Sequence, residues 1–345
     1  MQTVPQAAAP TTQHTVRILG AGPAGLSAAI ILARAGKHAV VYEKNTSVGV
    51  RFNGDWQGIE NWTTKTDAIQ ELETLGIRAT FTHLPFAGIR LYNHRLSPTD
   101  IRTSGEPLYY LVRRGNDTGS FDQSLLDEAL EAGAEVRFNT TLSPAEADII
   151  ATGPCRKPPG VVRGMTFNTD LPNGAWLTIG DELSPQGYTY LLVAGGRATL
   201  ATVLFSDLGN AKQYLTKTIE AYQRLLGTTF EAGRQWTGQG NFSMPKSAVQ
   251  NGRLVAGEAA GFQDLFLGFG IRSSMLTGAL AAKSLLEGTN YDSLWKARFE
   301  SLMRTSKLNR LMFAKGRTLA YNVVWQMLSR SNNPARTLRR LYSWC

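Results

Sequence analysis

The sequence predicts an α/β fold in which a parallel sheet with covering helices alternates along the chain with a second, antiparallel sheet, and a helical segment follows. Three observations carry this prediction. A strand, a glycine-rich turn, a helix and another strand follow one another over residues 16–43. A strand, a glycine-rich turn and a helix recur over residues 253–286. Between them, short strand-like runs outnumber helices, which is typical of an inserted sheet domain.

The first of these units has the spacing of a dinucleotide-binding turn. A short apolar strand over residues 16–19 runs directly into Gly20-x-Gly22-x-x-Gly25. Gly20 permits the tight turn, Gly22 lets the backbone approach a pyrophosphate, and Gly25 lets the helix pack close to the strand. The start of the helix offers free N–H groups to the phosphates. We therefore count Ala24 with these three glycines as cofactor-binding residues.

An acidic residue at the end of the next strand selects the nucleotide. Glu43 stands 18 residues after Gly25 and ends the strand over residues 38–42. Its carboxylate is expected to accept hydrogen bonds from ribose hydroxyls and to repel a 2′-phosphate. Because the motif follows a strand, opens a helix and has this acid, it predicts a Rossmann-like domain for FAD or NAD rather than NADP.

The second unit resembles the closing flavin motif of the p-hydroxybenzoate-hydroxylase-like superfamily of FAD-containing oxidoreductases. In that pattern a strand ends in Gly-Asp, and the acid hydrogen-bonds the ribityl chain; this sequence has Gly257-Glu258. A glycine pair, here Gly268 and Gly270, and a helix that starts at Ile271 then lie near the pyrimidine edge of the flavin, where a helix N-terminus stabilises negative charge. An NAD dehydrogenase does not need this second motif, so the two together predict FAD.

Four intermediate positions fit the same superfamily. The resemblance implies that Arg114 touches the cofactor, although Arg113 and Arg114 are equally compatible with surface charges. It also implies that Val136 lies on the strand beside the adenine, and that Arg51 reaches the region of the ribityl chain and phosphates. Gly153 ends a strand over residues 148–153 and completes this set of cofactor-binding residues.

Two features narrow the resemblance to the geranylgeranyl reductase-like branch. The strand at 148–153 ends in Ala-Thr-Gly, as in that branch. Residues 185–193 are similar to a degenerate form of its motif Pro-x-x-Tyr-x-Trp-x-Phe-Pro: Pro185 and Tyr188 match, and Tyr190 replaces the tryptophan. In the family this strand lines the substrate cavity, so Tyr188 and Tyr190 are candidate catalytic residues. The alternative is a strand whose aromatic face packs on the core.

A loop rich in aromatic and acidic residues is expected beside the flavin. It runs over residues 54–62 and holds two tryptophans, an aspartate and a glutamate, a density unusual for a plain surface loop. Asp55, Trp56, Gln57 and Trp62 are therefore candidate substrate-pocket residues, with local packing as the alternative. The Trp-x-Trp-x-Ile-Pro string of flavin-dependent halogenases is absent from the chain.

The other elements complete the prediction. A helix over residues 67–75 is expected to be capped by Thr66. Further helices are expected over 125–132, 211–226 and 271–286, and further strands over 87–92, 108–112, 135–138, 161–167, 175–179, 188–193 and 198–205. The domains are then a disordered arm (1–15), a discontinuous FAD-binding domain (16–77, 116–153 and 250–287), a substrate domain (78–115 and 154–249) and a basic helical C-terminal segment (288–345).

The net charge of +9 is concentrated in that last segment. Residues 291–345 hold eleven Lys or Arg against Asp292 and Glu300. Leucines, methionines and valines recur among these cations near helical spacing. The pattern suits amphipathic helices at an anionic membrane surface. The alternative is a helical cap on the substrate domain with a solvated basic face. No nucleic-acid recognition module accompanies the segment, so no nucleic acid is expected as a partner.

Several classes of protein are excluded. Cys155 and Cys345 cannot form a disulfide framework or a four-cysteine metal site, and the four histidines lack metal-ligand spacing, so no metal is expected. No apolar run approaches the roughly 18 residues that span a bilayer. The polar residues 1–15 lack a secretory signal pattern. We expect a cytoplasmic protein with peripheral membrane contact.

Taken together, the motifs predict an FAD-dependent oxidoreductase. It is expected to act on an apolar, isoprenoid-type or lipid substrate by hydride transfer, with reduction of a C=C bond as the main hypothesis. NAD(P)H or a ferredoxin-type donor would supply the electrons. The alternative is an FAD-dependent monooxygenase of an aromatic or polycyclic substrate. A different class, a non-enzymatic membrane- or nucleic-acid-binding protein with a vestigial fold, is the third hypothesis.

Overall fold

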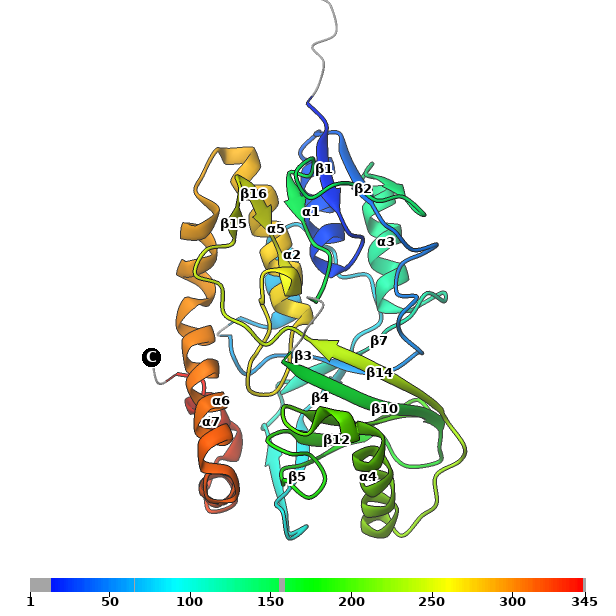
Figure 1. Ribbon diagram of the computed structural model, residues 1–345, viewed down its shortest axis with the longest axis vertical. Helices are drawn as coiled ribbons and strands as arrows, with labels where there is room; N and C mark the ends of the chain where they lie inside the picture. The colour runs from blue at the N-terminus through cyan, green and yellow to red at the C-terminus, as the bar shows by residue number, and fades with distance from the viewer. Residues whose placement is uncertain (1–13, 65, 155–158, 344–345) are drawn as a thin grey trace, which may run out of the picture.

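A computed structural model gives the fold of residues 14–64, 66–154 and 159–343 (Figure 1). Within these ranges the strands form three sheets of six, seven and three strands. Almost all of the expected arm over residues 1–15, and both cysteines, lie outside the ranges that the structure describes.

The six-stranded sheet is the predicted Rossmann-like sheet. Its strand order is β15-β16-β9-β1-β2-β8, and every neighbouring pair is parallel except β15 with β16. The strands are β1 (Val16–Leu19), β2 (Ala39–Tyr42), β8 (Glu135–Arg137), β9 (Ile149–Ile150), β15 (Val249–Gln250) and β16 (Arg253–Val255). Segments more than 200 residues apart in the sequence thus meet in one sheet, which confirms the discontinuous α/β unit that the two motifs predict.

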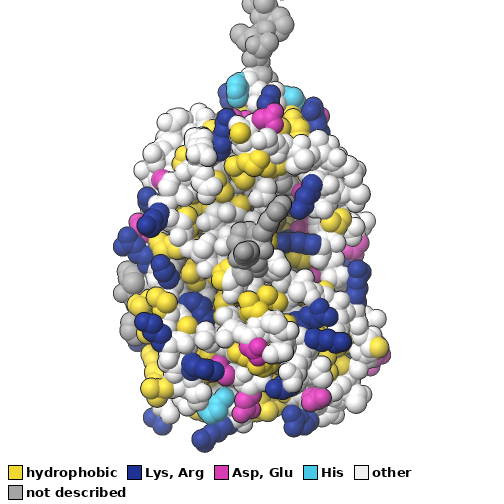
Figure 2. All heavy atoms as spheres, in the orientation of Figure 1, with side chains coloured by type: hydrophobic (Ala, Val, Ile, Leu, Met, Phe, Trp, Pro, Cys, Tyr) yellow, Lys and Arg dark blue, Asp and Glu magenta, His cyan; other side chains and the backbone are white. Residues whose placement is uncertain are grey.

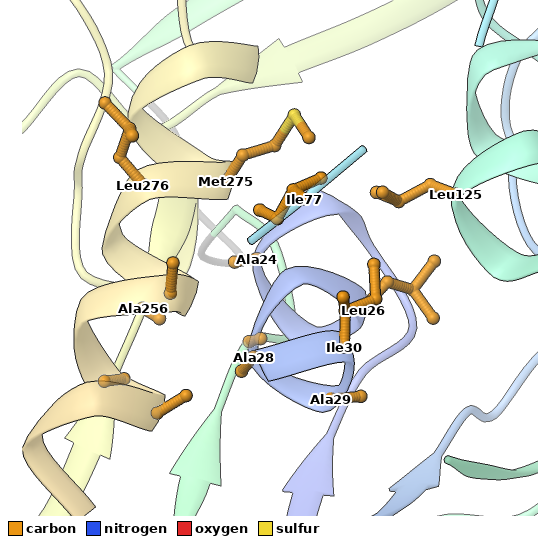
Figure 3. Packing of buried hydrophobic residues seen from close by; sticks show 14 of the residues in the cluster. Ala24, Leu26, Ala28, Ala29, Ile30, Ile77, Leu125, Ala256, Met275 and Leu276 are labelled. Atoms are coloured by element: carbon orange, nitrogen blue, oxygen red, sulfur yellow. The ribbon is translucent and has the colours of Figure 1, made fainter. Parts of the chain in front are cut away.

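Three helices cover this sheet: α1 (Pro23–Arg34), α3 (Phe121–Glu131) and α5 (Ile271–Glu287). Helix α1 lies between the other two, and its small residues let α5 approach closely (Figure 3). Ala24 and Ala28 of α1 are buried in one apolar cluster with Met275 and Leu276 of α5. Helix α3 begins four residues before the expected start, because the Ser120 side chain caps it by accepting a hydrogen bond from the Gln123 N–H at 3.3 Å.

The seven-stranded sheet forms the predicted second domain. Its order is β14-β10-β13-β12-β11-β5-β6, antiparallel except between β11 and β5. Helix α4 (Ala211–Leu226), preceded by the short helix η1 (Leu208–Asn210), packs on one of its faces. The strands are β5 (Gly88–Tyr92), β6 (Pro98–Arg102), β10 (Gly160–Asn168), β11 (Gly174–Thr178), β12 (Tyr188–Ala194), β13 (Arg197–Leu204) and β14 (Arg234–Gly240).

A small third sheet connects the two domains. It consists of β3 (Trp56–Glu60), β7 (Tyr109–Arg113) and β4 (Leu84–Phe86), and β7 is antiparallel to both neighbours. The segment expected as a loop at residues 54–62 is therefore mostly strand. Helix α2 (Ala68–Thr74) follows it. Its cap is Asp67 rather than the expected Thr66, because the Asp67 carboxylate accepts hydrogen bonds from the N–H groups of Ile69 and Gln70.

The C-terminal segment is an integral part of both domains. Helix α6 (Tyr291–Ser329) runs the length of the molecule, and α7 (Pro334–Arg340) packs beside its end (Figure 1). Its first half buries Trp295 and Phe299 in the core of the Rossmann-like sheet. Its second half buries Phe313 and Tyr321 in a separate apolar core with residues of the small sheet and of β5, β6 and β11. The axis bends at Arg317, whose φ of 42° lies outside the helical region. Among the described residues, no helix is long and apolar enough to cross a membrane.

Candidate active site: one cavity from the glycine-rich turn to the C-terminal helices

A cavity of about 900 Å³ lies between the Rossmann-like sheet and the second sheet. Both predicted motifs reach it, and so do β12 and the C-terminal helices. Its charged lining residues all come from positions 43–55, 114–122 and 258. The far end is apolar. The side chains there include Ile89, Leu91, Ile101, Leu177, Ile179, Val324, Leu328, Leu338 and Leu341.

The glycine-rich turn has the geometry of a pyrophosphate cradle. A Cβ on Gly25 would stand 1.9 Å from the carbonyl oxygen of Gly20, so only glycine allows α1 to start this close to β1. Gly20 itself has a φ of +105°, which favours glycine. A Cβ on Gly22, in contrast, meets nothing within 4 Å, and Gly22 lines the cavity. The turn therefore leaves open space where the cofactor phosphates are expected, and these residues fit a bound dinucleotide.

Glu43 is held at the cavity wall by neighbouring backbone. Its Oε2 accepts a hydrogen bond from the Ala21 N–H at 2.9 Å, and its Oε1 accepts one from the Asn45 N–H, also at 2.9 Å. The carboxylate is thus fixed beside the glycine-rich turn. Val136, expected beside the adenine, lies on β8 and pairs with Val41 of β2. It is not among the residues that line the cavity. The segment just after β8 lines the cavity instead, through Thr141, Leu142 and Pro144, which carry no sequence motif.

Glu258 stands where the strand of the second motif ends. It belongs to the short helix η2 (Gly257–Ala259), next to β16. Its Oε1 accepts a hydrogen bond from the Asn241 N–H at 3.1 Å, and the Arg51 guanidinium lies 3.8 Å from its Oε2. Burial raises the pKa of the Glu258 carboxyl, and Arg51 opposes that shift. Gly153 also lines the cavity, and a Cβ on it would stand 3.9 Å from the Arg51 guanidinium.

Arg114 is the centre of a buried polar chain beside the cavity. Its side chain is 4 % exposed and donates two hydrogen bonds to Asp122, at 2.7 and 2.8 Å. Its third contact is the Oε1 of Gln57 at 2.9 Å, and the Gln57 amide donates to Asp55 at 2.8 Å. The structure therefore brings together three of the predicted site residues, and Asp122 is a fourth member that the sequence motifs did not single out.

Strand β12 presents two tyrosines to the cavity. Tyr188 and Tyr190 line it, whereas Leu191 and Val193 point to the opposite face and pack with Tyr222 of α4. This alternation is what a half-buried strand requires. Burial raises the pKa of both cavity tyrosines, so both phenols keep their protons at neutral pH.

The two tryptophans are positioned by different elements. The indole N–H of Trp56 donates to the Arg197 carbonyl at 3.1 Å, and its backbone N–H donates to Thr199 Oγ1 at 2.8 Å, so the second sheet holds it. Trp62 meets Phe269 edge-to-face, with ring centroids 4.8 Å apart. Both tryptophans line the cavity, as do Asp55 and Gln57, so the predicted substrate-pocket residues lie together.

The loop between η2 and α5 is shaped by a half-buried aspartate that the sequence motifs did not point to. Asp264 accepts hydrogen bonds from the N–H groups of Phe266 and Leu267 at 3.1 and 2.7 Å. It also accepts one from the Tyr342 hydroxyl at 2.9 Å and one from Ser306 of α6. The C-terminal segment thus fixes the loop that carries Gly268 and Gly270, both of which line the cavity. Ile271, the first residue of α5, lines it too.

Substituting Tyr342 tests this attachment. Tyr342 is buried, and Tyr342→Phe takes its hydroxyl donor from the Asp264 carboxylate, so we expect the free energy of unfolding to fall by about 1.5–3 kcal/mol in urea denaturation. The matched control is Tyr214→Phe. There a tyrosine hydroxyl also donates to a carboxylate, that of Asp207, at 2.9 Å, but on the surface. Its loss should cost about 0.5 kcal/mol or less. Equal losses in the two variants would contradict an anchoring role for Asp264.

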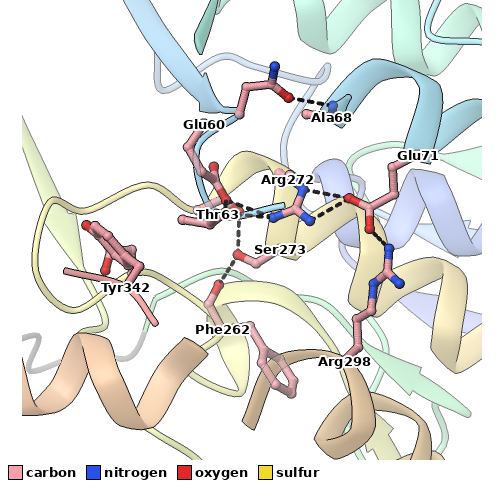
Figure 4. Close-up of polar contacts among 12 residues, drawn as sticks. Glu60, Thr63, Ala68, Glu71, Phe262, Arg272, Ser273, Arg298 and Tyr342 are labelled. Carbon is pink, nitrogen blue, oxygen red and sulfur yellow. Dashed lines mark hydrogen bonds and ion pairs between the residues drawn. The ribbon is translucent and has the colours of Figure 1, made fainter. Parts of the chain in front are cut away.

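A buried ion-pair network fastens the start of α5 to the small sheet (Figure 4). Arg272 lies between Glu60 at the end of β3 and Glu71 of α2, at 3.3 and 2.6 Å. The three side chains are 2–7 % exposed. Arg298 of α6 reaches the same Glu71 from the surface (Figure 4). Among the described residues, no cluster of His, Cys, Asp or Glu is suited to hold a metal ion.

The comparisons with known proteins agree with this geometry. A family model described as an NAD(P)-binding Rossmann-like domain matches residues 18–56. The digeranylgeranylglycerophospholipid reductase of Methanoculleus marisnigri is 25% identical over 340 residues, covering 82% of each chain. The structure of a geranylgeranyl bacteriochlorophyll reductase-like protein of Thermoplasma acidophilum superposes with a TM-score of 0.75 at 18% identity, covering 96% of this chain and 97% of the other.

This chain is similar in sequence to digeranylgeranylglycerophospholipid reductases and has the fold of FAD-dependent oxidoreductases. The same fold also serves other flavin chemistry. The flavin-dependent brominase Bmp2 superposes with a TM-score of 0.65 at 15% identity, covering 96% of this chain and 94% of the other. The fold class predicted from the motifs is thereby confirmed, and the predicted resemblance to geranylgeranyl reductases agrees with these matches. Which substrate this geranylgeranyl reductase-like chain takes depends on its own cavity.

Proposed function

We propose that this chain binds FAD and reduces C=C bonds of an isoprenoid-type lipid. The observation that carries the proposal is the division of the single cavity into two chemically different ends. The glycine-rich turn, Glu43 and Glu258 line one end, whereas aliphatic side chains from the seven-stranded sheet and from α6 and α7 line the other. A long apolar chain fits the second end because no charged residue among the described ones lines it. The curated relative named above acts on such a lipid by name.

The residues at the polar end would hold and orient the cofactor. Gly22 and the start of α1 would receive the pyrophosphate, Glu43 the ribose, and Glu258 the ribityl chain. Gly268, Gly270 and the N-terminus of α5 would lie beside the flavin ring, where a helix dipole favours negative charge. When bound, FAD supplies the hydride for the reduction.

The chain itself would supply a proton and exclude water. Saturating a double bond needs a proton at the second carbon, and Tyr188 and Tyr190 are the protonated groups on the cavity wall of β12. The Tyr188 hydroxyl donates to the carbonyl of Leu267. No such contact is found for the Tyr190 hydroxyl within the described part of the chain, so Tyr190 is the better candidate donor. The surrounding apolar side chains keep solvent from competing for the hydride.

The proposal also includes a source of electrons for the flavin. The reductant is NAD(P)H or a ferredoxin-type donor, and a stopped-flow assay with each donor under anaerobic conditions distinguishes the two.

An FAD-dependent monooxygenase is the second candidate function, since the brominase Bmp2 shares the fold. This alternative predicts oxygen consumption that the substrate stimulates.

Under the reductase proposal, the basic C-terminal segment would bind the anionic membrane surface that holds the lipid substrate.

The test of the proposed function begins with Glu43. The purified protein is expected to show the visible absorption of bound oxidised flavin. Glu43→Ala should weaken FAD binding about tenfold or more, because hydrogen bonds from the ribose to a carboxylate are lost. Glu43→Gln keeps an acceptor oxygen and should fall between the two. Equilibrium titration with FAD, monitored by flavin fluorescence, measures all three.

Reduction itself is measured by mass spectrometry of the lipid. A geranylgeranyl lipid incubated anaerobically with the reduced enzyme should gain two mass units for each double bond saturated. A protein that takes up no FAD would overturn the proposal. A flavoprotein that leaves every isoprenoid lipid unchanged but consumes oxygen with an aromatic substrate would favour the monooxygenase instead.

A further inference from the structure

The outer face of α6 carries an unusual set of exposed apolar side chains. Six of the nine large hydrophobic side chains that are exposed in the described part of the chain lie on this one helix. They are Leu308, Leu311, Met312, Leu319, Val323 and Met327. The first three precede the bend at Arg317 and the last three follow it. Within each set of three, positions three or four residues apart lie on one side of that half of the helix. We call this set the α6 stripe. Figure 2 shows apolar and basic side chains interspersed along the edge of the molecule where α6 runs.

The charged residues in the segment of the chain that carries the α6 stripe are all basic. Residues 301–345 include no Asp or Glu, but nine Lys or Arg. Arg317 and Arg339 are paired with Asp181 and Glu106 of the second domain. Other cations of this region form no ion pair with any residue in ranges 14–64, 66–154 and 159–343. These are Lys307, Lys315, Arg330, Arg336 and Arg340.

The α6 stripe lies directly behind the apolar end of the cavity. Val324 and Leu328 line the cavity, and each follows an exposed member of the stripe, Val323 and Met327, by one position. Only the thickness of this helix therefore separates the outer surface from the place where a lipid chain would end. Helix α7 adjoins this turn and lines the cavity through Leu338.

We propose that the α6 stripe docks the protein on an anionic lipid bilayer, with α6 lying in the plane of the interface. Exposed Leu, Val and Met, interspersed with Lys and Arg that form no ion pair within the described ranges, are what such a surface attracts. A second copy of the chain is a poor occupant, because a symmetric contact would set two acid-free basic segments against each other. A nucleic acid would leave the apolar side chains without a partner.

This inference rests on the proposed function for its purpose, since docking would place the apolar end of the cavity at the source of a lipid substrate. It also extends that function by naming the surface through which the lipid arrives. The binding itself does not depend on FAD or on turnover, so it is measured on its own.

The experiment is flotation of the full-length protein with vesicles. Vesicles of phosphatidylcholine containing phosphatidylglycerol are expected to carry the protein upward, and vesicles of phosphatidylcholine alone to carry much less. The triple variant Leu319→Ser, Val323→Ser, Met327→Ser should lower binding to the anionic vesicles about tenfold or more. The matched control, Leu130→Ser with Leu285→Ser, changes side chains of similar exposure on α3 and α5 and should bind as the wild type does.

Three outcomes would overturn the inference. The wild type fails to float with anionic vesicles, or the triple variant floats as well as the control, or light scattering shows a wild-type dimer that the triple variant loses. FAD content distinguishes these from failure of the proposed function. If the triple variant keeps its flavin and reduces a detergent-solubilised lipid while losing vesicle binding, both proposals stand. If the wild type binds vesicles but takes up no FAD, only the proposed function fails.

Discussion

Arg272→Met is expected to lower the free energy of unfolding by about 3–5 kcal/mol, because it leaves Glu60 and Glu71 buried without their shared cation. Both carboxylates are less than a tenth exposed, and Arg272 contacts each of them at the start of α5 (Figure 4). Methionine has a similar volume, so the loss of charge rather than a cavity would dominate. Urea denaturation followed by circular dichroism measures the change.

The pH dependence of this variant gives a readout that simple loss of packing would not. Burial raises the pKa of Glu60 on folding, so the folded state keeps a proton that the unfolded chain releases. The free energy of unfolding therefore falls as the pH rises from the ordinary glutamate value towards the raised one. Without Arg272 that pKa rises further. The loss of stability caused by the substitution should thus be smaller near pH 5 than near pH 8.

Arg298 provides the matched control. It contacts the same Glu71, but its side chain is 51% exposed. Because solvent screens that pair, Arg298→Met should cost no more than about 1 kcal/mol at either pH. If the two arginine variants lose equal stability, or if the loss in Arg272→Met is independent of pH, the buried network does not fasten α5 in the way that the contacts indicate.

The parts of the site that could be predicted from sequence are those that depend on the backbone. Gly20, Gly22 and Gly25 follow from the close approach of helix, strand and phosphate, so their spacing between a strand and a helix identifies them. Glu43 follows because the end of the adjacent strand is fixed by the same unit. The resemblance of residues 185–193 to a family motif implies a strand that lines the cavity, and Tyr188 and Tyr190 do line it.

The parts that could not be predicted depend on contacts between distant segments. Nothing near Asp264 in the sequence indicates that Ser306 and Tyr342 will hold it. Residues 56–60 read as a loop because Gly58 interrupts their apolar pattern, yet pairing with β7 makes them a strand. The pattern of α6 is ambiguous for a related reason: its apolar residues serve a buried face and an exposed one at once, and only tertiary packing assigns each residue to a face.

Gly278→Ala is expected to affect the core and the cofactor site together. A Cβ on Gly278 of α5 would stand 2.0 Å from the backbone carbonyl oxygen of Ala24. Ala24 lies in the first turn of α1, within the glycine-rich motif. Backbone cannot rotate away as a side chain does, so α1 and α5, which pack closely through small residues (Figure 3), must move apart. We expect the free energy of unfolding to fall by about 3 kcal/mol, the upper end for overpacking a core.

The decisive measurement is FAD affinity alongside stability. Ala24 lies between the glycines of the first motif, and Gly278 lies one to two turns after Ile271 of the second, so displacement of one helix distorts both halves of the predicted cofactor site. Gly209→Ala is the control, because its Cβ meets nothing within 4 Å and its φ is not in the left-handed region. That substitution should change stability by about 0.5 kcal/mol or less and leave FAD binding intact. If Gly278→Ala is destabilised but binds FAD as tightly as the wild type, the cofactor does not rest on the contact between α1 and α5. If neither the stability nor the FAD affinity changes, α1 and α5 do not approach each other as closely as the structure indicates.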